Sequence, residues 1–369
     1  MIDWHFPRTR LAALHLGHFF DHGIARLAFF GRRRIGKTEY LQRDLIPEAE
    51  AKGVRTVYCS FWENKDQPHL ALLRALHEAV PLDGVKAKAK FGLHLGVADA
   101  SLEVERAERP RAALPGELTQ LAQLFQRWVG ALEGRPGLIV LDEIQHLATS
   151  AQFATFAASL RTLLDMAPPG LRVVFTGSSL VDLQRLFEEQ KAAFFNFATV
   201  LDFPVLERPF IDHLVSIHQR ITGQTLEADL LWEIFGEVGC NAQLVTGLVE
   251  QLVLRQSDDL AGLWTEFSDT LLGDDGWCAR QWADLALSDQ AVYLLLREGR
   301  ELFAEESLAL YERLGFSRGT AQKALSRLIN RSLLHRTGHG RYERIVPVLD
   351  KWLSGRGVTT AALVSPGPT

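Results

Sequence analysis

The feature that most constrains the fold of this chain is the alternation of short apolar runs with longer segments of helical periodicity. The apolar runs lie at 24–30, 54–61, 137–143, 171–177 and 197–206. Helical patterns lie between them at 37–53, 69–80 and 115–132. Runs such as "GLIVLDE" and "LRVVFTG" are apolar at successive positions, as in strands that are buried on both faces. Strands that alternate with helices form parallel sheets with right-handed crossovers, so we predict an α/β fold.

The second half of the chain changes in character. From residue 208 to about 275 the pattern is helical, and after a break at "GDDG" three more helical patterns precede a hairpin pattern, "HRTGHGRYERIV". Residues 82–114 interrupt the earlier alternation and are interpreted as an inserted hairpin or a loop. The predicted domains are an α/β domain at 1–207, a helical domain at 208–275 and a helix-and-hairpin domain at 280–354, followed by a disordered tail at 355–369.

The composition excludes several classes of protein. The 369 residues carry a net charge of −5, which excludes a uniformly basic nucleic-acid coat but not a local basic face. Cys59, Cys240 and Cys278 are widely spaced, so neither a disulfide framework nor a zinc site is expected. The sequence has neither an N-terminal signal pattern nor an apolar run of membrane-spanning length. We expect a cytoplasmic protein without a membrane partner.

The segment "GRRRIGKT" at 31–38 fits the spacing G-x-x-x-x-G-K-[ST]. The glycines allow a tight turn whose N–H groups converge on phosphate oxygens, and the following helix directs the positive end of its dipole there. Lys37 is expected to reach the β- and γ-phosphates, and the Thr38 hydroxyl to bind Mg²⁺. The alternative, a glycine turn with surface arginines, is less consistent with a position between a strand and a helix. The expected phosphate-binding residues are Gly31, Arg32, Arg33, Arg34, Ile35, Gly36, Lys37, Thr38 and Glu39.

The segment "LIVLDEIQHL" at 138–147 supplies the acidic half of such a site. A buried strand would present Asp142 and Glu143 at its C-terminal edge, where open α/β sheets bind ligands. Asp142 is expected to hold Mg²⁺, and Glu143 to orient and deprotonate the attacking water. The alternative is a solvated strand end.

The next strand ends in "FTGSS" at 175–179. Thr176 or Ser178 is expected to donate a hydrogen bond to the γ-phosphate or to the attacking water, and Thr176 is the predicted catalytic residue of the two. The alternative for Ser178 and Ser179 is a role in capping the turn.

These motifs resemble the archaeal-type ATPase family, in the AAA+/STAND branch of the P-loop NTPases. The resemblance rests on "GRRRIGKTEYL", "VLDEIQHL", "FTGSSLVDL" and the C-terminal winged-helix pattern, and it covers most of the chain except 82–114. It implies a P-loop NTPase parallel sheet sandwiched by helices, then a helical lid and a winged-helix domain. It also implies ATP and Mg²⁺ as ligands.

Two departures from the family pattern bear on turnover. Relatives often carry an arginine near the position of Asn196. If that arginine completes a neighbouring chain's site, this chain either lacks it or uses Arg185 or Arg208 as a substitute. Relatives often have a Gly-x-Pro pattern in the lid, where this chain has "GCNAQL" at 239–244. The resemblance therefore allows either slow hydrolysis or a switch that nucleotide controls.

The N-terminal segment "FPRTRLAAL" at 6–14 lies where such proteins often hold adenine. Phe6 and Arg8 are the candidates. The alternative for Phe6 is a hydrophobic staple that attaches a short helix to the core.

The C-terminal pattern fits two helices and a wing, with Ser317 as the N-cap of the second helix. The residues expected to contact double-stranded DNA are Arg318, Gln322, Lys323, Arg327 and Arg341, within a basic face that also holds Arg331, His335, Arg336 and Arg344. The alternatives are packing against the chain's own nucleotide-binding domain and binding of a partner protein.

Three functions follow from these patterns. The first is an ATPase that couples nucleotide state to DNA or to a partner protein, with a homo-oligomer as an additional expectation. The second is a DNA-binding regulator that uses ATP as a switch ligand with little turnover. The third, an interaction protein with a degenerate site, is disfavoured because Lys37, Thr38, Asp142 and Glu143 are all present.

Overall fold

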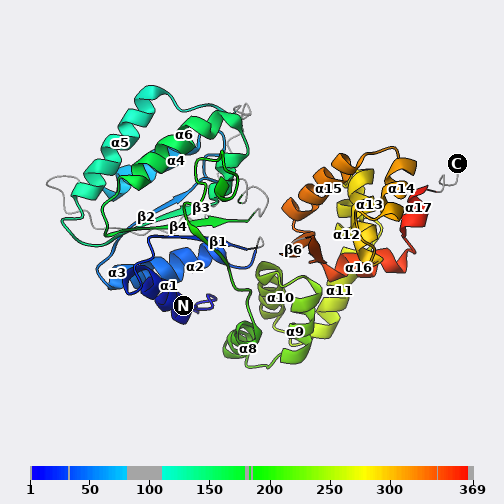
Figure 1. Ribbon diagram of the computed structural model, residues 1–369. Helices are drawn as coiled ribbons and strands as arrows, with labels where there is room; N and C mark the ends of the chain where they lie inside the picture. Colours follow the sequence, from blue (N-terminus) through cyan, green and yellow to red (C-terminus); the bar gives the residue numbers. More distant parts are fainter. Residues whose placement is uncertain are drawn as a thin grey trace, which may run out of the picture.

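A computed structural model describes residues 2–31, 34–80, 110–178, 183, 186–338 and 340–364, without the side chains of 336–338. Five strands form a parallel sheet in the order β2-β3-β4-β1-β5 (Figure 1). They are β1 (Arg26–Phe30), β2 (Arg55–Ser60), β3 (Gly137–Asp142), β4 (Leu171–Gly177) and β5 (Thr199–Asp202). The predicted parallel α/β sheet is therefore confirmed, and β4 lies between β1 and β3.

Helices cover both faces of the sheet (Figure 1). One face carries α1 (Thr9–Phe20), α2 (Lys37–Tyr40), the π-helical turn η1 (Leu41–Leu45) and α3 (Ile46–Ala51). The other carries α4 (Pro68–Ala79), α5 (Pro115–Gly130) and α6 (Ala154–Asp165), with the 3₁₀ turns η2 (Ile144–Ala148) and η3 (Ala151–Phe153) between β3 and α6. In β3, Leu138 and Val140 pack on the first face, and Ile139 and Leu141 on the second. Successive side chains of a strand point to opposite faces, which explains the unbroken apolar run.

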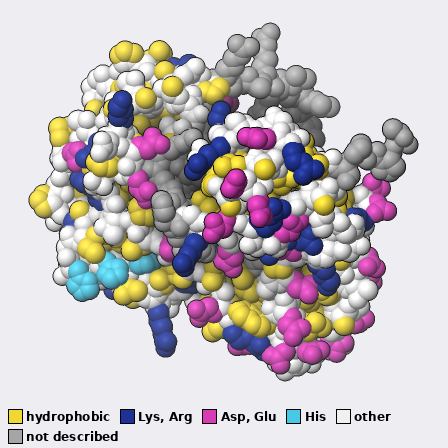
Figure 2. Space-filling model, turned by 45° about the vertical axis from the view of Figure 1, so that its right-hand side comes forward, with side chains coloured by type: hydrophobic (Ala, Val, Ile, Leu, Met, Phe, Trp, Pro, Cys, Tyr) yellow, Lys and Arg dark blue, Asp and Glu magenta, His cyan; other side chains and the backbone are white. Residues whose placement is uncertain are grey.

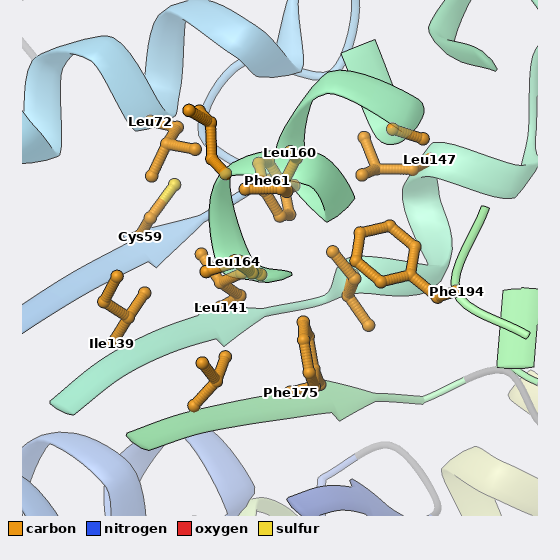
Figure 3. Close-up of a cluster of buried hydrophobic side chains, with 14 of the residues drawn as sticks. Cys59, Phe61, Leu72, Ile139, Leu141, Leu147, Leu160, Leu164, Phe175 and Phe194 are labelled. Carbon is orange, nitrogen blue, oxygen red and sulfur yellow. The ribbon is translucent and has the colours of Figure 1, made fainter. Parts of the chain in front are cut away.

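The larger core lies between the sheet and α4–α6 (Figure 3). Cys59, Ile139, Leu141 and Phe175 point from three strands towards leucines of α4 and α6. Phe175 is fully buried, and its ring lies 5.3 to 6.1 Å, between centroids, from three other phenylalanine rings of the same core. Phe175 is thus a central packing residue of the β4 strand.

A helical segment follows the sheet. It contains α8 (Arg208–Thr222), α9 (Ala228–Glu237), α10 (Ala242–Arg255) and α11 (Leu260–Leu272), which enclose a core of their own. Trp4 and Phe6, from the N-terminal segment, pack against this core. The first residues of the chain therefore connect the sheet to the helical segment.

The C-terminal segment encloses a further core. Its elements are α12 (Trp277–Ala283), α13 (Leu287–Arg297), α14 (Glu305–Arg313), α15 (Arg318–Asn330), β6 (Leu334–Gly338), β7 (Arg341–Arg344), α16 (Pro347–Gly355) and α17 (Thr360–Val364). The order from α13 to β7, three helices and an antiparallel hairpin, is the one expected of a winged helix. Trp264 and Phe267 of α11 pack against both this core and that of the helical segment. The domain limits at 207, 275 and 354 stay a prediction.

The disordered tail expected at 355–369 is wrong for part of its length. Thr360 begins α17, and its backbone N–H and its hydroxyl each donate a 2.7 Å hydrogen bond to the Glu298 carboxylate. Arg297 Nη1 donates to the Val358 carbonyl oxygen at 2.7 Å. These two side chains fix the segment to the end of α13, which composition alone does not reveal. Residues 365–369 lie outside the described residues, as do 82–109 of the expected insertion. No helix of the described chain is both long and apolar enough to cross a membrane.

Shortening Phe175 to alanine should destabilise the sheet domain by about 3–5 kcal/mol, because the cavity left beside the other phenylalanines cannot fully collapse. Thermal and urea unfolding of the Phe175→Ala variant measure the loss. Met166→Ala is the control, since Met166 is 61% exposed and its replacement should change stability by less than about 0.5 kcal/mol. Equal stability of the two variants would contradict the described core.

Candidate functional site

The candidate site lies where three neighbouring strands end. Gly31 follows β1, Asp142 ends β3, and Thr176 is the penultimate residue of β4. Because β4 pairs with both β1 and β3 in parallel, these three positions meet at the same edge of the sheet. The sheet order thus brings the two sequence motifs together although more than a hundred residues separate them.

The glycine-rich loop has the backbone that its motif predicts. Gly36 has a φ of 83° and precedes the first residue of α2, a conformation that favours glycine. A Cβ on Gly31 would lie 2.6 Å from the Ile35 side chain, which is buried in the core. Lys37 is only 6% exposed, and its Nζ donates to the Gly31 carbonyl oxygen at 2.6 Å. The Ile35 side chain therefore points into the core and only its backbone faces the site, while the Lys37 side chain folds back over the loop.

Two of the loop arginines, Arg32 and Arg33, lie outside the described residues. Arg34 is exposed and has a φ of 65°. Glu39, on α2, is exposed and lines the same cavity as Lys37 and Thr38. The individual contacts expected of these residues stay predictions.

Asp142 is the most heavily bonded side chain of the site, with an exposed fraction of 1%. Its Oδ2 accepts from Thr38 Oγ1 at 2.8 Å and from the Tyr58 hydroxyl at 2.9 Å. Its Oδ1 accepts from the Thr176 hydroxyl and, at 3.1 Å, from the Glu143 backbone N–H. The predicted metal-binding pair, Thr38 and Asp142, is therefore in direct contact, and Thr176 lies beside it.

Glu143 follows in the left-handed region with a φ of 57°, which turns its side chain away from the strand direction. Its Oε2 accepts from Ser178 Oγ at 2.8 Å and from the Gln145 side-chain amide. Gly177 leaves room for that amide, because a Cβ there would lie 2.7 Å from Gln145 Oε1. Ser178 thus contacts the predicted base, whereas Ser179 lies outside the described residues.

The oxygen atoms of this cluster suit a magnesium ion. A hydroxyl and a carboxylate lie 2.8 Å apart, and Mg²⁺ is usually bound by one or two protein oxygens together with phosphates and waters. Within the described chain no group of three or more His, Cys, Asp or Glu side chains is placed to hold a metal. The donors therefore fit a metal that arrives with a phosphate ligand.

Two cavities meet at the glycine-rich loop. One of about 530 Å³ is lined by Lys37, Thr38, Asp142, Glu143 and Ser178. The other, of about 500 Å³, is lined by the N-terminal segment and by the first turn of α10, and both share Arg34, Gly36 and Glu39. The two cavities together could accommodate an elongated ligand across the loop.

Phe6 and Arg8 both line the second cavity. The Phe6 ring lies 5.9 Å from that of Phe210 and 5.6 Å from that of His213, both on α8, so Phe6 contacts the helical segment. Arg8 donates to the Ile35 carbonyl oxygen at 2.8 Å and to the Pro204 carbonyl oxygen at 3.1 Å. These contacts place both residues beside the loop, and their adenine-binding role stays a prediction.

The sequence patterns did not single out His5. Its Nδ1 lies 2.9 Å from Glu39 Oε1, and its Nε2 lies 3.0 Å from Oδ1 of the buried Asp44. Burial lowers the pKa of His5, but the hydrogen bonds and charges of Asp44 and Glu39 outweigh this effect and raise it to about 9. A charged His5 therefore attaches the N-terminal segment to the helical run that begins at Lys37.

The segment "GCNAQL" at 239–244, where a Gly-x-Pro pattern was considered, has a defined place in the structure. Asn241 caps α10, because its Oδ1 accepts from the Leu244 N–H at 3.1 Å. Gly239 has a φ of 70°, and a Cβ there would lie 2.1 Å from the Ile345 carbonyl oxygen. The "GCNAQL" segment thus shapes the turn between α9 and α10 and its contact with the C-terminal segment.

Of the two arginines considered as substitutes at the Asn196 position, Arg208 is engaged in ion pairs. Arg208 pairs with Asp229 at 2.7 Å and with Asp212 at 3.3 Å. Arg185 lies outside the described residues. Asn196 has a φ of 51°, and its backbone N–H donates to the Phe187 carbonyl oxygen at 3.0 Å.

The predicted DNA-contacting residues divide into two groups. Arg318, Gln322, Lys323 and Arg341 are exposed. Arg327 is exposed as well, but it is paired with Asp289, which is 2% exposed, and its Nη2 also donates to Ser288 Oγ at 3.0 Å. Arg327 therefore joins α15 to α13, and its contact with DNA stays a prediction.

Some of the other residues of the basic face also make contacts within the chain. Arg331 is exposed, whereas Arg344 donates to Asp350 at 2.7 Å and to the Leu296 carbonyl oxygen at 2.8 Å. The His335 ring stacks on Phe30, with centroids 5.9 Å apart and planes 7° apart. The hairpin thus packs beside the end of β1, in agreement with the first alternative for the winged helix, packing against the chain's own sheet domain. The Arg336 side chain lies outside the described residues.

The charged His5 gives the stability of this region a defined pH dependence. A folded-state pKa of about 9, against an ordinary 6.5, means that the contribution is fully present below pH 6.5 and is lost as the pH rises through 9. The melting-temperature difference between the wild type and His5→Gln should therefore shrink above pH 9. His77→Gln, which replaces an exposed histidine of α4, is the control. A difference that stays constant from pH 6 to pH 10 would contradict the ion pairs.

The comparisons with known proteins concern the fold. No protein-family model and no curated protein matches the sequence. Among solved structures, a Walker-type ATPase of Pyrococcus abyssi superposes with a TM-score of 0.57 at 14% identity, covering 93% of this chain and 95% of that one. The ADP form of the ORC2 protein of Aeropyrum pernix superposes with a TM-score of 0.53 at 16% identity, covering 97% and 94%. Both alignments run over nearly the full length of each chain, so this chain has the fold of the P-loop ATPases, as its motifs predict.

Proposed function

We propose that this chain binds ATP together with Mg²⁺ at the glycine-rich loop and hydrolyses it to ADP and phosphate. The observation that carries the proposal is the contact between Thr38 and Asp142, with Lys37 on one side and Glu143 on the other. An ordinary glycine turn would not need a buried lysine, nor a buried carboxylate bonded to the residue that follows it. The ADP bound to the Aeropyrum pernix neighbour is consistent with this assignment.

Each residue of the site has a task in this reaction. Lys37 leaves the Gly31 carbonyl oxygen and binds the β- and γ-phosphate oxygens, and the backbone N–H groups of the loop hold the same phosphates. Thr38 and Asp142 would hold Mg²⁺, which neutralises the charge that develops on the phosphates. The adenosine end would lie in the second cavity, beside Phe6 and the first turn of α10.

Glu143 is the base of the proposed mechanism. It accepts a proton from a water whose oxygen attacks the γ-phosphorus, while the bond to the β,γ-bridging oxygen breaks and ADP leaves. Ser178 and Gln145 both donate to Glu143 Oε2. These donors hold the oxygen that would receive the proton, so a rearrangement around Ser178 would accompany catalysis.

Coupling of nucleotide state to the C-terminal segment is part of the proposal. Arg34 lines both cavities described above and a third one, of about 390 Å³, whose other walls come from the helical and C-terminal segments. The stack of His335 on Phe30 lies one residue before the loop. A phosphate that moved the loop would therefore disturb contacts of the hairpin.

The second candidate is a DNA-binding regulator in which ATP acts as a switch ligand. Arg318, Gln322 and Lys323 are exposed in the first turns of α15, the helix that would enter a major groove. Lys and Arg side chains are interspersed with Asp and Glu on the face of the molecule in Figure 2. The DNA-binding surface would therefore be local, and α15 would supply its centre.

Two substitutions test the nucleotide site. Lys37→Ala should abolish ATP binding, because the β- and γ-phosphates lose the ammonium group that would bind them, whereas Lys52→Ala, which removes an exposed lysine after α3, should not. Glu143→Gln should retain ATP but lower steady-state turnover by about 10²–10⁴-fold. Calorimetry measures binding, and phosphate release measures turnover. Unchanged turnover in Glu143→Gln would defeat the proposed base.

A salt titration of duplex binding tests the DNA surface. Each DNA phosphate that the protein neutralises adds about 0.9 to the steepness with which log affinity falls against log salt. The double variant Arg318→Ala/Lys323→Ala should therefore show a slope that is shallower by about 2. Arg127→Ala, which removes an exposed arginine from α5, should leave the slope unchanged. Wild-type affinity that is absent at low salt, or indifferent to salt, would rule out this surface.

A further inference from the structure

Tyr58 contacts the acidic half of the site from a strand that carries no part of either motif. Its hydroxyl donates to Asp142 Oδ2 at 2.9 Å, next to the 2.8 Å hydrogen bond from Thr38. In the parallel pair β2–β3, Tyr58 is level with Val140 and Ser60 is level with Asp142. Tyr58 therefore lies two residues behind the level of Asp142 on the same face of the sheet, and its long side chain spans that offset.

The surroundings of Tyr58 fix its hydroxyl as a donor. The ring packs against the core between the sheet and α1–α3. An ionised carboxylate only accepts hydrogen bonds, so the Tyr58 hydroxyl is the donor of the pair.

The two oxygens of Asp142 are held from opposite sides. Thr176 and the Glu143 N–H donate to Oδ1, and Thr38 and Tyr58 donate to Oδ2. This inference rests on the proposed function. In that function the Thr38 hydroxyl oxygen would turn to Mg²⁺, so the geometry of its hydrogen bond to Asp142 Oδ2 would change. Of the donors recorded for Oδ2 among the described residues, Tyr58 is the one that does not also bind the ligand.

We propose that Tyr58 is a positioning residue, which holds the Asp142 carboxylate in the orientation that receives the Mg²⁺–ATP complex. It does not touch the reacting atoms. Without its hydroxyl, Oδ2 would lose the donor that remains when Thr38 engages the metal, and the carboxylate could rotate about its bond to Cβ. Groups that orient a metal ligand in this way commonly change metal affinity by about 10–100-fold when removed.

The test is Tyr58→Phe, which deletes the hydroxyl and keeps the ring. Calorimetric titration of ATP at a series of Mg²⁺ concentrations gives the metal concentration for half-maximal enhancement of binding, and we expect it to rise at least about 10-fold. Electron paramagnetic resonance of Mn²⁺ with ATP gives the metal affinity directly, without turnover. ATP affinity in the presence of EDTA should stay unchanged, which a general disruption of the site would not permit.

Tyr293→Phe is the matched control. Tyr293 also donates to a carboxylate, Asp350 Oδ1 at 3.0 Å, but it lies in the C-terminal segment. Its loss should leave the metal dependence of nucleotide binding at the wild-type value. Melting temperatures of both variants report whether each one folds.

The outcomes separate this inference from the proposed function. A wild-type chain that does not bind ATP with Mg²⁺ overturns both. Wild-type binding that Lys37→Ala abolishes, with the same metal dependence in Tyr58→Phe as in the wild type, overturns the role of Tyr58 alone. A metal-specific loss in Tyr58→Phe, absent in Tyr293→Phe, supports it.

Discussion

The candidate site depends on one buried carboxylate, that of Asp142. Burying a charge is costly unless donors surround it, and here the donors come from the helix after the glycine-rich loop, from β2, from β4 and from the backbone of Glu143. Each donor belongs to a different part of the chain, so four segments meet at the Asp142 carboxylate. The sheet order makes this convergence feasible, because β4 separates β1 from β3 by the width of a single strand.

The glycine-rich loop is the second point at which distant parts of the chain meet. Here the N-terminal, helical and C-terminal segments come together, whereas at Asp142 it is mainly the strands of the sheet. Arg8 fixes the N-terminal segment to the Ile35 carbonyl oxygen, and His5 pairs with two carboxylates of the helical run behind the loop. Trp4 and Phe6 continue from there into the core of the helical segment. The stack of His335 on Phe30 adds the C-terminal hairpin. A ligand at this loop would therefore contact, or lie beside, every major part of the molecule.

Much of this arrangement could be predicted from the sequence, for physical reasons. The strands can be predicted because a strand buried on both faces has an unbroken apolar run. The loop can be predicted because phosphate geometry fixes the spacing of glycine, lysine and threonine. The hydrogen-bond and ion-pair partners of the site residues cannot be predicted in this way. Tyr58 reaches Asp142 only through the register of β2 against β3, and Gln145 reaches Glu143 only through the left-handed turn that follows β3. The pairing of Arg327 with Asp289 likewise needed the packing of α15 on α13. Such contacts depend on tertiary geometry, which no short pattern contains.

The turn at Gly239 has a mechanical consequence. Backbone meets backbone there, since even one methyl group would collide with the Ile345 carbonyl oxygen, and no side chain lies between them to slide or repack. Trp264 and Phe267 belong to the cores on both sides of the same junction. A rotation of α9 and α10 would accordingly displace the segment that follows the hairpin as well, and the stack of His335 on Phe30 would resist that rotation from the side of the sheet.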